Sequence, residues 1–254
     1  MDLKTQQRSA ALITGAARRI GAAIARALSR DGYDVVLHAN QSRADAEALA
    51  HEIESDGGRA AVVIGDLADA AALRAIVPAA SAHGPLSLLV NNASVFDDDG
   101  VATMTRGGFE RTMAVNLTAP LFLAQAFAAQ APRHAASAIV NIVDQRVLRP
   151  TPKFFSYALS KASLYAATTT LAQALAPLRV NAVAPGPTLP SPRQNSDQFA
   201  AQAALVPLGE GPSPEDIASA VAYLAGARSV TGTTIAVDGG QHLSWRTPDT
   251  EVPE

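Results

Sequence analysis

Tyr157 and Lys161 are the two residues whose types and spacing most directly suggest chemistry. Residues four apart lie on one face of a helix, so the ammonium group of Lys161 can approach the phenol of Tyr157. A nearby cation favours the phenolate, lowers a phenol pKa that starts near ~10 and makes the hydroxyl a better proton donor. Asp144, which follows the apolar run 139–143, could reach the same point from the other side. An amphipathic helix with a half-buried tyrosine and a solvated lysine has the same pattern, so the pair needs support from the rest of the chain.

The bulk composition is that of a soluble globular protein. The chain has 254 residues, 48% of them hydrophobic, and a formal net charge of −3. This length can bury a substantial core, and the slight acidity gives no electrostatic footprint for nucleic acid or an anionic membrane. The N-terminus lacks the apolar region of a secretory signal, and no segment approaches the apolar length of a membrane span, so a cytoplasmic protein is expected.

The cysteine and histidine content of the chain predicts neither a thiol site nor a metal site. Cysteine is absent, which excludes disulfides and thiolate chemistry. The five histidines show no ligand spacing, so no metal site is predicted, and they are interpreted as surface or cofactor-rim residues. They stand at positions 38, 51, 83, 134 and 242.

A glycine turn follows the first apolar run, residues 10–14. Gly15 ends this run, and Ile20, Ile24 and Leu28 then recur at four-residue spacing, which predicts a helix with one apolar face. The N–H groups at the start of such a helix can bind a dinucleotide pyrophosphate. The incomplete glycine pattern also fits an ordinary strand-to-helix turn of an α/β protein.

Apolar strands and helical segments alternate along the whole chain. Further strands are expected at 34–38, 60–64, 86–90, 139–143, 178–182 and 233–237, and helices at about 43–55, 68–82, 106–130, 156–176 and 217–224. This order predicts one doubly wound α/β domain with a seven-stranded, mostly parallel sheet and helices on both faces. Ligands bind such sheets outside the carboxyl ends of the strands, where Gly15, His38, Asp66, Asn91 and Asp144 fall. Residues 187–212 are interpreted as a mobile lid, and residues 244–254 as a polar tail.

The order of these motifs resembles that of the short-chain dehydrogenase/reductases. The match covers about residues 9–243 and rests on Thr14-Gly15, Arg19, Gly21, Asn91-Asn92-Ala93-Ser94, Asn116, Tyr157, Lys161, Pro185-Gly186 and Asp238-Gly239-Gly240. In that family the tyrosine donates a proton to the substrate. The lysine lowers its pKa and binds the nicotinamide ribose, and the helix asparagine holds a water of the proton relay. The resemblance therefore implies a Rossmann fold with catalytic roles for Tyr157, Lys161 and Asn116.

Two departures from the family pattern indicate the pteridine reductase branch, which includes bacterial dihydromonapterin and dihydrofolate reductases. Arg19 stands at the usual second glycine of the turn, and Asp144 stands at the usual catalytic serine. Phe96 matches a phenylalanine that stacks on the pterin in this branch. The resemblance thus implies that Phe96, Asp144 and Tyr157 bind the substrate.

The chemistry of Asp144 supports the same interpretation. A serine hydroxyl donates a hydrogen bond to a carbonyl oxygen, whereas an ionised aspartate only accepts, which suits a ring bearing N–H and amino donors. A carboxylate beside Tyr157 would also oppose phenolate formation and keep the tyrosine protonated. These properties fit reduction of a C=N bond better than reduction of a ketone. Asp144 could alternatively cap the loop that follows it.

The residues after the second strand predict NADPH in preference to NADH. No carboxylate stands there to bind the ribose hydroxyls of NAD and repel a 2′-phosphate. Arg19, Ser42 and Arg43, with Asn40 as a further donor, could bind this phosphate, although Arg18 and Arg43 could singly be solvated helix-end charges. Asp66 resembles the family residue that contacts the adenine. The resemblance also places Gly15, Arg18, Ile20, Gly21, His38, Leu67, Asn92, Ala93, Ser94, Pro185, Gly186 and Thr188 at the cofactor, with Tyr157 and Lys161.

The leading hypothesis is an NADPH-dependent reductase of a pterin or dihydrofolate-type substrate. A carbonyl or 3-oxoacyl thioester reductase would share the same tyrosine and lysine. A non-catalytic dinucleotide-binding protein would not need a tuned proton donor. The family resemblance also implies a homotetramer paired through helices 106–130 and 156–176, where Ala124, Ala128, Ala162 and Ala166 would permit close packing.

Overall fold

A computed structural model describes residues 9–132, 134, 136–191 and 193–245 and contains a seven-stranded sheet of order β3-β2-β1-β4-β5-β6-β7. The strands are β1 (Ala10–Ile13), β2 (Asp34–Ala39), β3 (Ala60–Ile64), β4 (Leu86–Asn91), β5 (Ala138–Ile142), β6 (Arg179–Pro185) and β7 (Thr234–Val237). Every pair of neighbouring strands is parallel. The sheet grows outward in both directions from β1 and β4, which confirms the predicted doubly wound fold.

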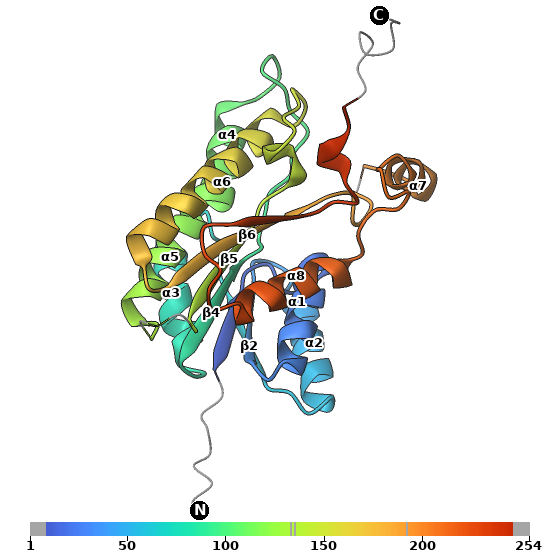
Figure 1. Ribbon diagram of the computed structural model, residues 1–254. Coiled ribbons are helices and arrows are strands. Elements are labelled where there is room, and N and C mark those ends of the chain that lie inside the picture. Colours follow the sequence, from blue (N-terminus) through green and yellow to red (C-terminus); the bar gives the residue numbers. More distant parts are fainter. Residues whose placement is uncertain (1–8, 133, 135, 192, 246–254) are drawn as a thin grey trace, which may run out of the picture.

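Helices cover both faces of this sheet (Figure 1). On one face lie α1 (Arg19–Arg30), α2 (Arg43–Ser55) and α8 (Pro214–Gly226), and on the other lie α3 (Ala70–Ser81), α4 (Arg106–Met113), α5 (Ala119–Gln130) and α6 (Phe155–Leu175). Side chains of a strand alternate between these faces, so Ala11 and Ile13 join one core and Ala10 and Leu12 the other. Because both faces are buried, most strand residues are apolar, although buried polar residues such as Asn91, Asn141 and Asn181 stand among them.

The predicted helix over 106–130 is interrupted. Between α4 and α5 the chain forms one turn of π-helix, Ala114–Thr118, which contains the buried Asn116. A π-turn inserted in an α-helix is typical of functional positions. The combined stretch Arg106–Gln130 is long and apolar enough to cross a membrane, contrary to the expectation that no segment is. Here it packs into the protein, with Leu123 and Phe127 in the core beside the sheet.

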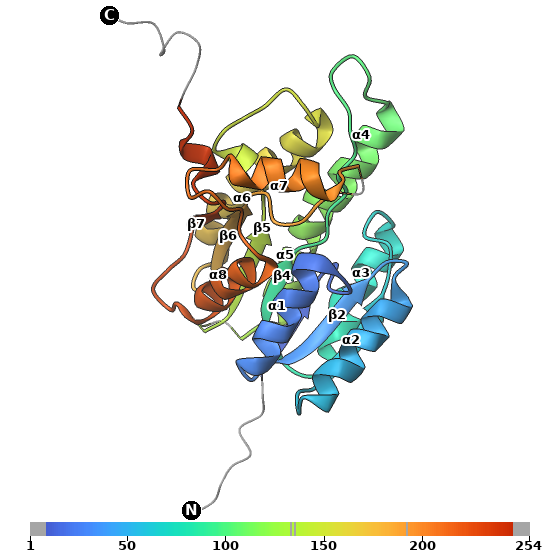
Figure 2. The ribbon, with the colours of Figure 1, turned by 90° about the vertical axis from the view of Figure 1, so that its right-hand side faces the viewer.

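The segment 187–212, called the lid below, is less irregular than expected. It contains α7 (Ser196–Ala204), which begins with a capping box between Asn195 and Gln198. None of its residues is buried, so the helix lacks the apolar face by which sequence periodicity would reveal it. Seen from the side, α7 lies beyond the carboxyl ends of the strands (Figure 2). Only Ser244 and Trp245 of the predicted polar tail belong to the described residues.

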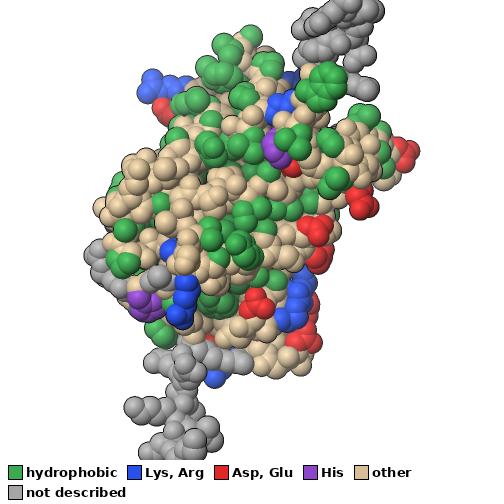
Figure 3. Space-filling model, in the orientation of Figure 1, with side chains coloured by type: hydrophobic (Ala, Val, Ile, Leu, Met, Phe, Trp, Pro, Cys, Tyr) green, Lys and Arg blue, Asp and Glu red, His purple; other side chains and the backbone are tan. Residues whose placement is uncertain are grey.

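The face turned to the viewer in Figure 3 carries mainly hydrophobic and uncharged side chains. Acidic side chains gather along its right-hand edge, and basic ones are scattered singly or in small groups. This distribution agrees with the small net charge of −3. It gives that face no continuous basic surface of the kind that binds a phosphate backbone.

Candidate active site

A cavity of about 710 Å³ opens at the carboxyl ends of the central strands. The turn after β1, the segment after β4, the end of β5, the start of α6 and the lid all contribute to its wall. This is where a doubly wound sheet binds its ligands, because the chain crosses to opposite faces at β1 and β4 and leaves a crevice. Most of the residues singled out from the sequence meet here: Gly15, Arg18, Arg19, Ile20, Gly21, His38, Asn40, Asp66, Leu67, Asn92, Ala93, Ser94, Phe96, Asp144, Tyr157, Lys161, Pro185, Gly186 and Thr188.

His38, near the end of β2, holds the glycine turn after β1 in place. The backbone N–H of Gly15 donates to Nδ1 of His38 at 3.3 Å, and Nε2 of the same ring lies 3.0 Å from the carbonyl oxygen of Gly65. Nδ1 therefore accepts and Nε2 donates, which defines a neutral imidazole. Burial lowers the pKa of His38 and favours this form. Of the two positions expected for the histidines, a surface position is wrong for His38, because the residue is 1% exposed, whereas a position at the rim of the cofactor agrees with its place in the cavity wall.

Asn92 ties the same turn to the end of β4. Its side-chain amide donates to the carbonyl oxygens of Thr14 and Gly15 at 2.9 and 3.0 Å, and the Thr14 hydroxyl accepts from the backbone of Asn92 and Ala93. Space is tight beneath the turn. A Cβ on Gly21 would lie 2.2 Å from the Gly15 carbonyl oxygen, and one on Gly15 would lie 2.9 Å from Cα of Ala93.

Replacing Gly21 by alanine is expected to lower the free energy of unfolding by about 1–3 kcal/mol, because backbone atoms must move to admit the methyl group. Urea denaturation of both proteins measures this change. Gly107 is the matched control, since a Cβ there meets nothing within 4 Å. Gly107→Ala should leave stability unchanged or raise it by up to ~1 kcal/mol. Equal effects of the two substitutions would contradict the close contact.

Of the residues predicted to bind a 2′-phosphate, Arg19 and Asn40 line the cavity, whereas Ser42 and Arg43 do not. Arg19 has a left-handed backbone, with φ of 56°, and its guanidinium donates to the lid carbonyls of Pro190 and Leu189 at 2.9 and 3.3 Å. Ser42 and Arg43 stand at the start of α2, outside the cavity wall, where Arg43 pairs with Glu47. The phosphate contact of these side chains stays a prediction.

Two further candidates near the turn have partners of their own. Arg18 is exposed, and its Nε donates to Asp45 of α2 at 2.8 Å, as expected for a surface charge. Asp66 accepts from the backbone N–H of Ala68 at 2.9 Å and approaches Arg111 at 3.4 Å. The hydrogen bond to Ala68 is the main reason why the pKa of Asp66 is lowered. Asp66 is therefore held as a carboxylate at the cavity wall.

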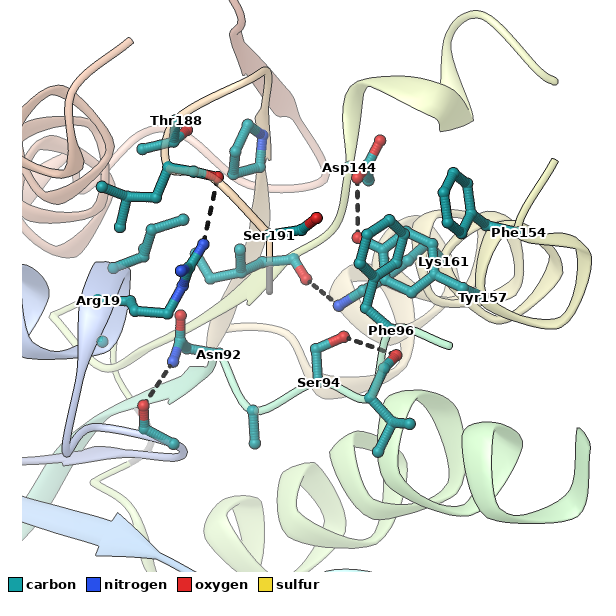
Figure 4. A pocket seen from close by; sticks show the side chains of 18 of the residues that line it. Arg19, Asn92, Ser94, Phe96, Asp144, Phe154, Tyr157, Lys161, Thr188 and Ser191 are labelled. Atoms are coloured by element: carbon teal, nitrogen blue, oxygen red, sulfur yellow. Dashed lines mark hydrogen bonds between the residues drawn. The ribbon is translucent and has the colours of Figure 1, made fainter. Parts of the chain in front are cut away.

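Tyr157, Asp144 and Lys161 come together at the end of β5, as predicted (Figure 4). The Tyr157 hydroxyl donates to Oδ2 of Asp144 at 2.8 Å, and Nζ of Lys161 donates to the backbone carbonyl of Ile142 at 2.8 Å. Asp144 also accepts from the backbone N–H of Arg146 at 2.8 Å, so the alternative role as a loop cap is realised in the same side chain.

The pKa of Tyr157 is raised, whereas a neighbouring Lys161 was expected to lower it. Burial raises it well above 10, and the nearby Asp144 carboxylate raises it further. The Arg146 guanidinium lowers it, but by less than burial and Asp144 raise it. The ammonium group of Lys161 lies 5.8 Å from the centre of the tyrosine ring and is bonded to Ile142. The second expectation, that a carboxylate keeps Tyr157 protonated, agrees with the direction of the shift. Burial lowers the pKa of Lys161 from 10.5 to about 8.

This depressed lysine pKa predicts a pH-dependent stability. Between about pH 8 and 10.5 the unfolded chain holds a proton at Lys161 that the folded chain has released. Stability should therefore rise with pH across this window, by roughly 3 kcal/mol at most from this residue. Urea unfolding of Lys161→Met should lack that rise, whereas the exposed Lys153→Met should keep it. A wild-type curve that falls as steeply as that of Lys161→Met would contradict the prediction.

The side-chain amide of Asn116 makes all of its hydrogen bonds with other residues of the protein. Oδ1 accepts from the backbone N–H of Val95 at 2.8 Å and from the Ser94 hydroxyl at 3.3 Å. Nδ2 donates to the carbonyl of Val95 at 2.9 Å and to the Ser160 hydroxyl at 3.0 Å. All four positions of the amide are filled, so these contacts give Asn116 the role of fixing the segment before Phe96. They leave no side-chain donor or acceptor for the predicted relay water.

Sequence reasoning missed several residues of the cavity wall. Phe154 stacks on Phe96 with ring centroids 4.5 Å apart, and Arg146 pairs with Asp144 at 3.1 Å. Arg193 reaches from the lid to the carbonyl of Phe96. Gln145 is 7% exposed, and its Oε1 has no hydrogen-bond partner within the described part of the chain. Adjacency to Asp144 was the available signal for Gln145 and Arg146.

These features together define a class of protein. A doubly wound sheet, a tight glycine turn over a helix start, and a buried tyrosine and lysine at one cavity are the parts of a dinucleotide-dependent oxidoreductase. A family model described as enoyl-(acyl carrier protein) reductase matches residues 15–242. The chain belongs to the short-chain dehydrogenase/reductase family of oxidoreductases.

Three similar proteins illustrate the range of this family. The crystal structure of FolM alternative dihydrofolate reductase 1 from Brucella suis with NADP is 47% identical, covers 95% of this chain and 98% of that chain, and has a TM-score of 0.91. The corresponding protein from Brucella canis with NADP is 45% identical, covers 98% and 99%, and has a TM-score of 0.92. The 3-oxoacyl-(acyl-carrier-protein) reductase FabG of Staphylococcus aureus is 32% identical over 240 residues, which cover 92% of this chain and 98% of FabG.

Proposed function

We propose that the protein is an NADPH-dependent reductase that transfers hydride to a C=N bond of a pterin or dihydrofolate-type substrate. The observation that carries the proposal is the hydrogen bond from Tyr157 to Asp144, at the place where a ketone reductase of this family has a serine. Asp144 can only accept from a substrate, which matches the N–H and amino donors of a pterin ring. The two FolM relatives, named as alternative dihydrofolate reductases, support the same substrate class.

The residues around the glycine turn fit a dinucleotide. A Cβ on Gly15 or Gly21 would collide with backbone or with Asn92, so glycine at both positions lets the turn pack closely against the end of β4. The N–H groups at the start of α1, which follows this turn, would bind a pyrophosphate. Ala93 and Ser94 line the wall beyond it, and Lys161 lies where it can hold the nicotinamide ribose. NADPH supplies the hydride when bound. The NADP in both FolM structures supports this choice of cofactor.

Side chains of the protein supply the proton and orient the substrate. Tyr157 stays protonated because burial and Asp144 raise its pKa, so its hydroxyl is available as a proton donor. When hydride reaches the carbon of the C=N bond, the nitrogen takes this proton, and the product is a saturated C–N bond with an N–H. Asp144 accepts hydrogen bonds from the ring, and Arg146 holds the carboxylate in place at 3.1 Å. Phe96 provides an aromatic surface for the ring.

Turnover of candidate substrates tests the proposal. NADPH oxidation is followed at the nicotinamide absorbance with dihydrobiopterin, dihydromonapterin and dihydrofolate, beside ketones and a 3-oxoacyl thioester, and then with NADH. Preferential turnover of the pterins with NADPH is expected. Turnover of ketones or the thioester alone would refute the pterin assignment and favour the second candidate, a 3-oxoacyl thioester reductase, to which the FabG relative points.

We further infer a homotetramer. Phe122 on α5 and Leu159 and Tyr165 on α6 are large apolar side chains with 55%, 42% and 37% of their surface exposed. Ala162 and Ala166 are exposed beside them, as close packing requires, but Ala124 lies in the chain's own core, so its expected place in an interface is wrong. A light-scattering mass of one chain would refute the tetramer.

A further inference from the structure

An aromatic wall stands beside the catalytic tyrosine. The rings of Phe96 and Phe154 stack at 4.5 Å, and Phe96 meets Tyr157 edge-on at 4.6 Å. Phe154 has a left-handed backbone, with φ of 55°, and the next two residues are anchored on Asp99. The backbone N–H of Phe155 donates to the Asp99 carbonyl at 3.1 Å, and that of Ser156 to Oδ1 at 3.0 Å. The wall is thus held by the start of α6.

Two arginines lie against this wall. The guanidinium of Arg146 lies 5.6 and 5.3 Å from the ring centres of Phe96 and Phe154, and that of Arg193 lies 4.9 and 5.5 Å from them. All four distances fit a cation–π contact. Arg193 comes from the lid, and two of its N–H groups donate to the Phe96 carbonyl at 3.2 Å. The substrate end of the cavity therefore has positive charge next to aromatic rings.

The two arginines differ in how their charge is balanced. Arg146 is paired with Asp144, and of the other arginines of the cavity Arg18 pairs with Asp45 and Arg111 with Asp66. Arg193 forms no ion pair with any carboxylate of the described residues, and Asp98, which also lines the cavity, lies beyond pairing distance. Arg19 likewise donates only to carbonyls, but it lies at the glycine turn, where a dinucleotide carries its phosphates.

Arg193 also has hydrogen-bonding capacity to spare. A guanidinium has five N–H donors, and two of those of Arg193 go to Phe96. The remaining donors sit on an exposed side chain at the mouth of the cavity. An unpaired guanidinium with a free edge binds a carboxylate or phosphate, often through two hydrogen bonds.

We propose that Arg193 binds an anionic group on the side chain of the pterin substrate, either a tail carboxylate or a phosphate ester. The inference rests on the proposed function and extends it: the ring lies against Phe96 with its donors on Asp144, and the side chain leaves along the lid. The enzyme then prefers folate-type or phosphorylated pterins to uncharged ones. Arg193 is a specificity residue in this scheme and takes no part in proton transfer.

The test compares three substrates: dihydrofolate, which carries glutamate carboxylates, dihydroneopterin monophosphate, and uncharged dihydroneopterin. Arg193→Gln should lower kcat/KM for the anionic substrates about tenfold or more, mainly through KM, because the substrate loses a charge-assisted hydrogen bond. Dihydroneopterin should stay within about twofold. Arg149→Gln is the matched control, because Arg149 is exposed in the loop before α6 and lies outside the cavity wall.

The pattern across substrates decides the inference. A loss confined to dihydrofolate identifies a carboxylate, and a loss confined to the monophosphate identifies a phosphate; either supports the proposal. Pterin turnover with an equal loss on all three substrates, or with no loss on any, overturns it and leaves the proposed function standing. If the unaltered enzyme reduces no pterin, the proposed function fails and this inference fails with it.

Discussion

Tyr157→Phe should lower kcat by about 10²–10⁴-fold, the usual contribution of a positioned general acid. The substitution removes the hydroxyl that donates to Asp144 and leaves the ring, which packs against Phe96, in place. Because Tyr157 is buried, water has little access to replace the lost donor. Steady-state NADPH oxidation measures the loss, and the affinity for NADPH, read from nicotinamide fluorescence, should change little.

Tyr165→Phe on the same helix provides the control for this experiment. Tyr165 is 37% exposed and lies outside the cavity wall, so its variant should keep full activity. A Tyr157→Phe enzyme that retains most of its turnover would show that the proton comes from another group.

Asp144→Ser should separate pterin reduction from ketone reduction. Serine restores the residue type of ketone reductases in this family, so ketone turnover should hold or rise. Pterin kcat/KM should fall about 10- to 100-fold, because hydrogen bonds to a charged acceptor contribute ~1.5–3 kcal/mol. The two rates are measured by NADPH oxidation with a dihydropterin and with a ketone on the same enzyme preparation.

Asp98→Asn serves as the control for loss of negative charge. Asp98 lines the cavity but is exposed and makes no hydrogen bond with the other described residues, so both activities should persist. A uniform decline of pterin and ketone turnover in Asp144→Ser would mean that Asp144 only supports the local structure, through Arg146 and the turn that it caps.

The fold was predictable because its signals are local. The run Ala10–Ile13 is apolar along its whole length, and Leu86–Asn91 is apolar except at Ser87 and Asn91, as burial on both faces of a parallel sheet requires. The meeting of Gly15, Asp144 and Tyr157 was predictable for a related reason. Residues at the carboxyl ends of parallel strands come to one edge, whatever their separation in the chain.

The errors came from interactions between distant segments. The burial of His38 was not foreseen, because nothing local shows that Gly15 and Gly65 close around its ring. The predicted effect of Lys161, a lowered Tyr157 pKa, was wrong. Helical spacing reveals that Lys161 is near but does not reveal the burial of Tyr157, which is the largest cause of the pKa shift. Arg193 was overlooked because its partner, Phe96, is far away in the sequence.

The attachment of the lid to the last strand bears on how the enzyme is made. The backbone N–H of Gly186, just before the lid, donates to the carbonyl of Val237, and that of Leu208 donates to the carbonyl of Gly239, so both ends of the lid are anchored on the end of β7 and the residues that follow it. A Cβ on Gly186 would lie 2.6 Å from Cα of Asp238, which shows how closely the two segments meet. The two anchoring residues, Val237 and Gly239, are only two positions apart in the chain. A displacement of this short segment would therefore move both ends of the lid at once, and with them the wall of the binding cleft.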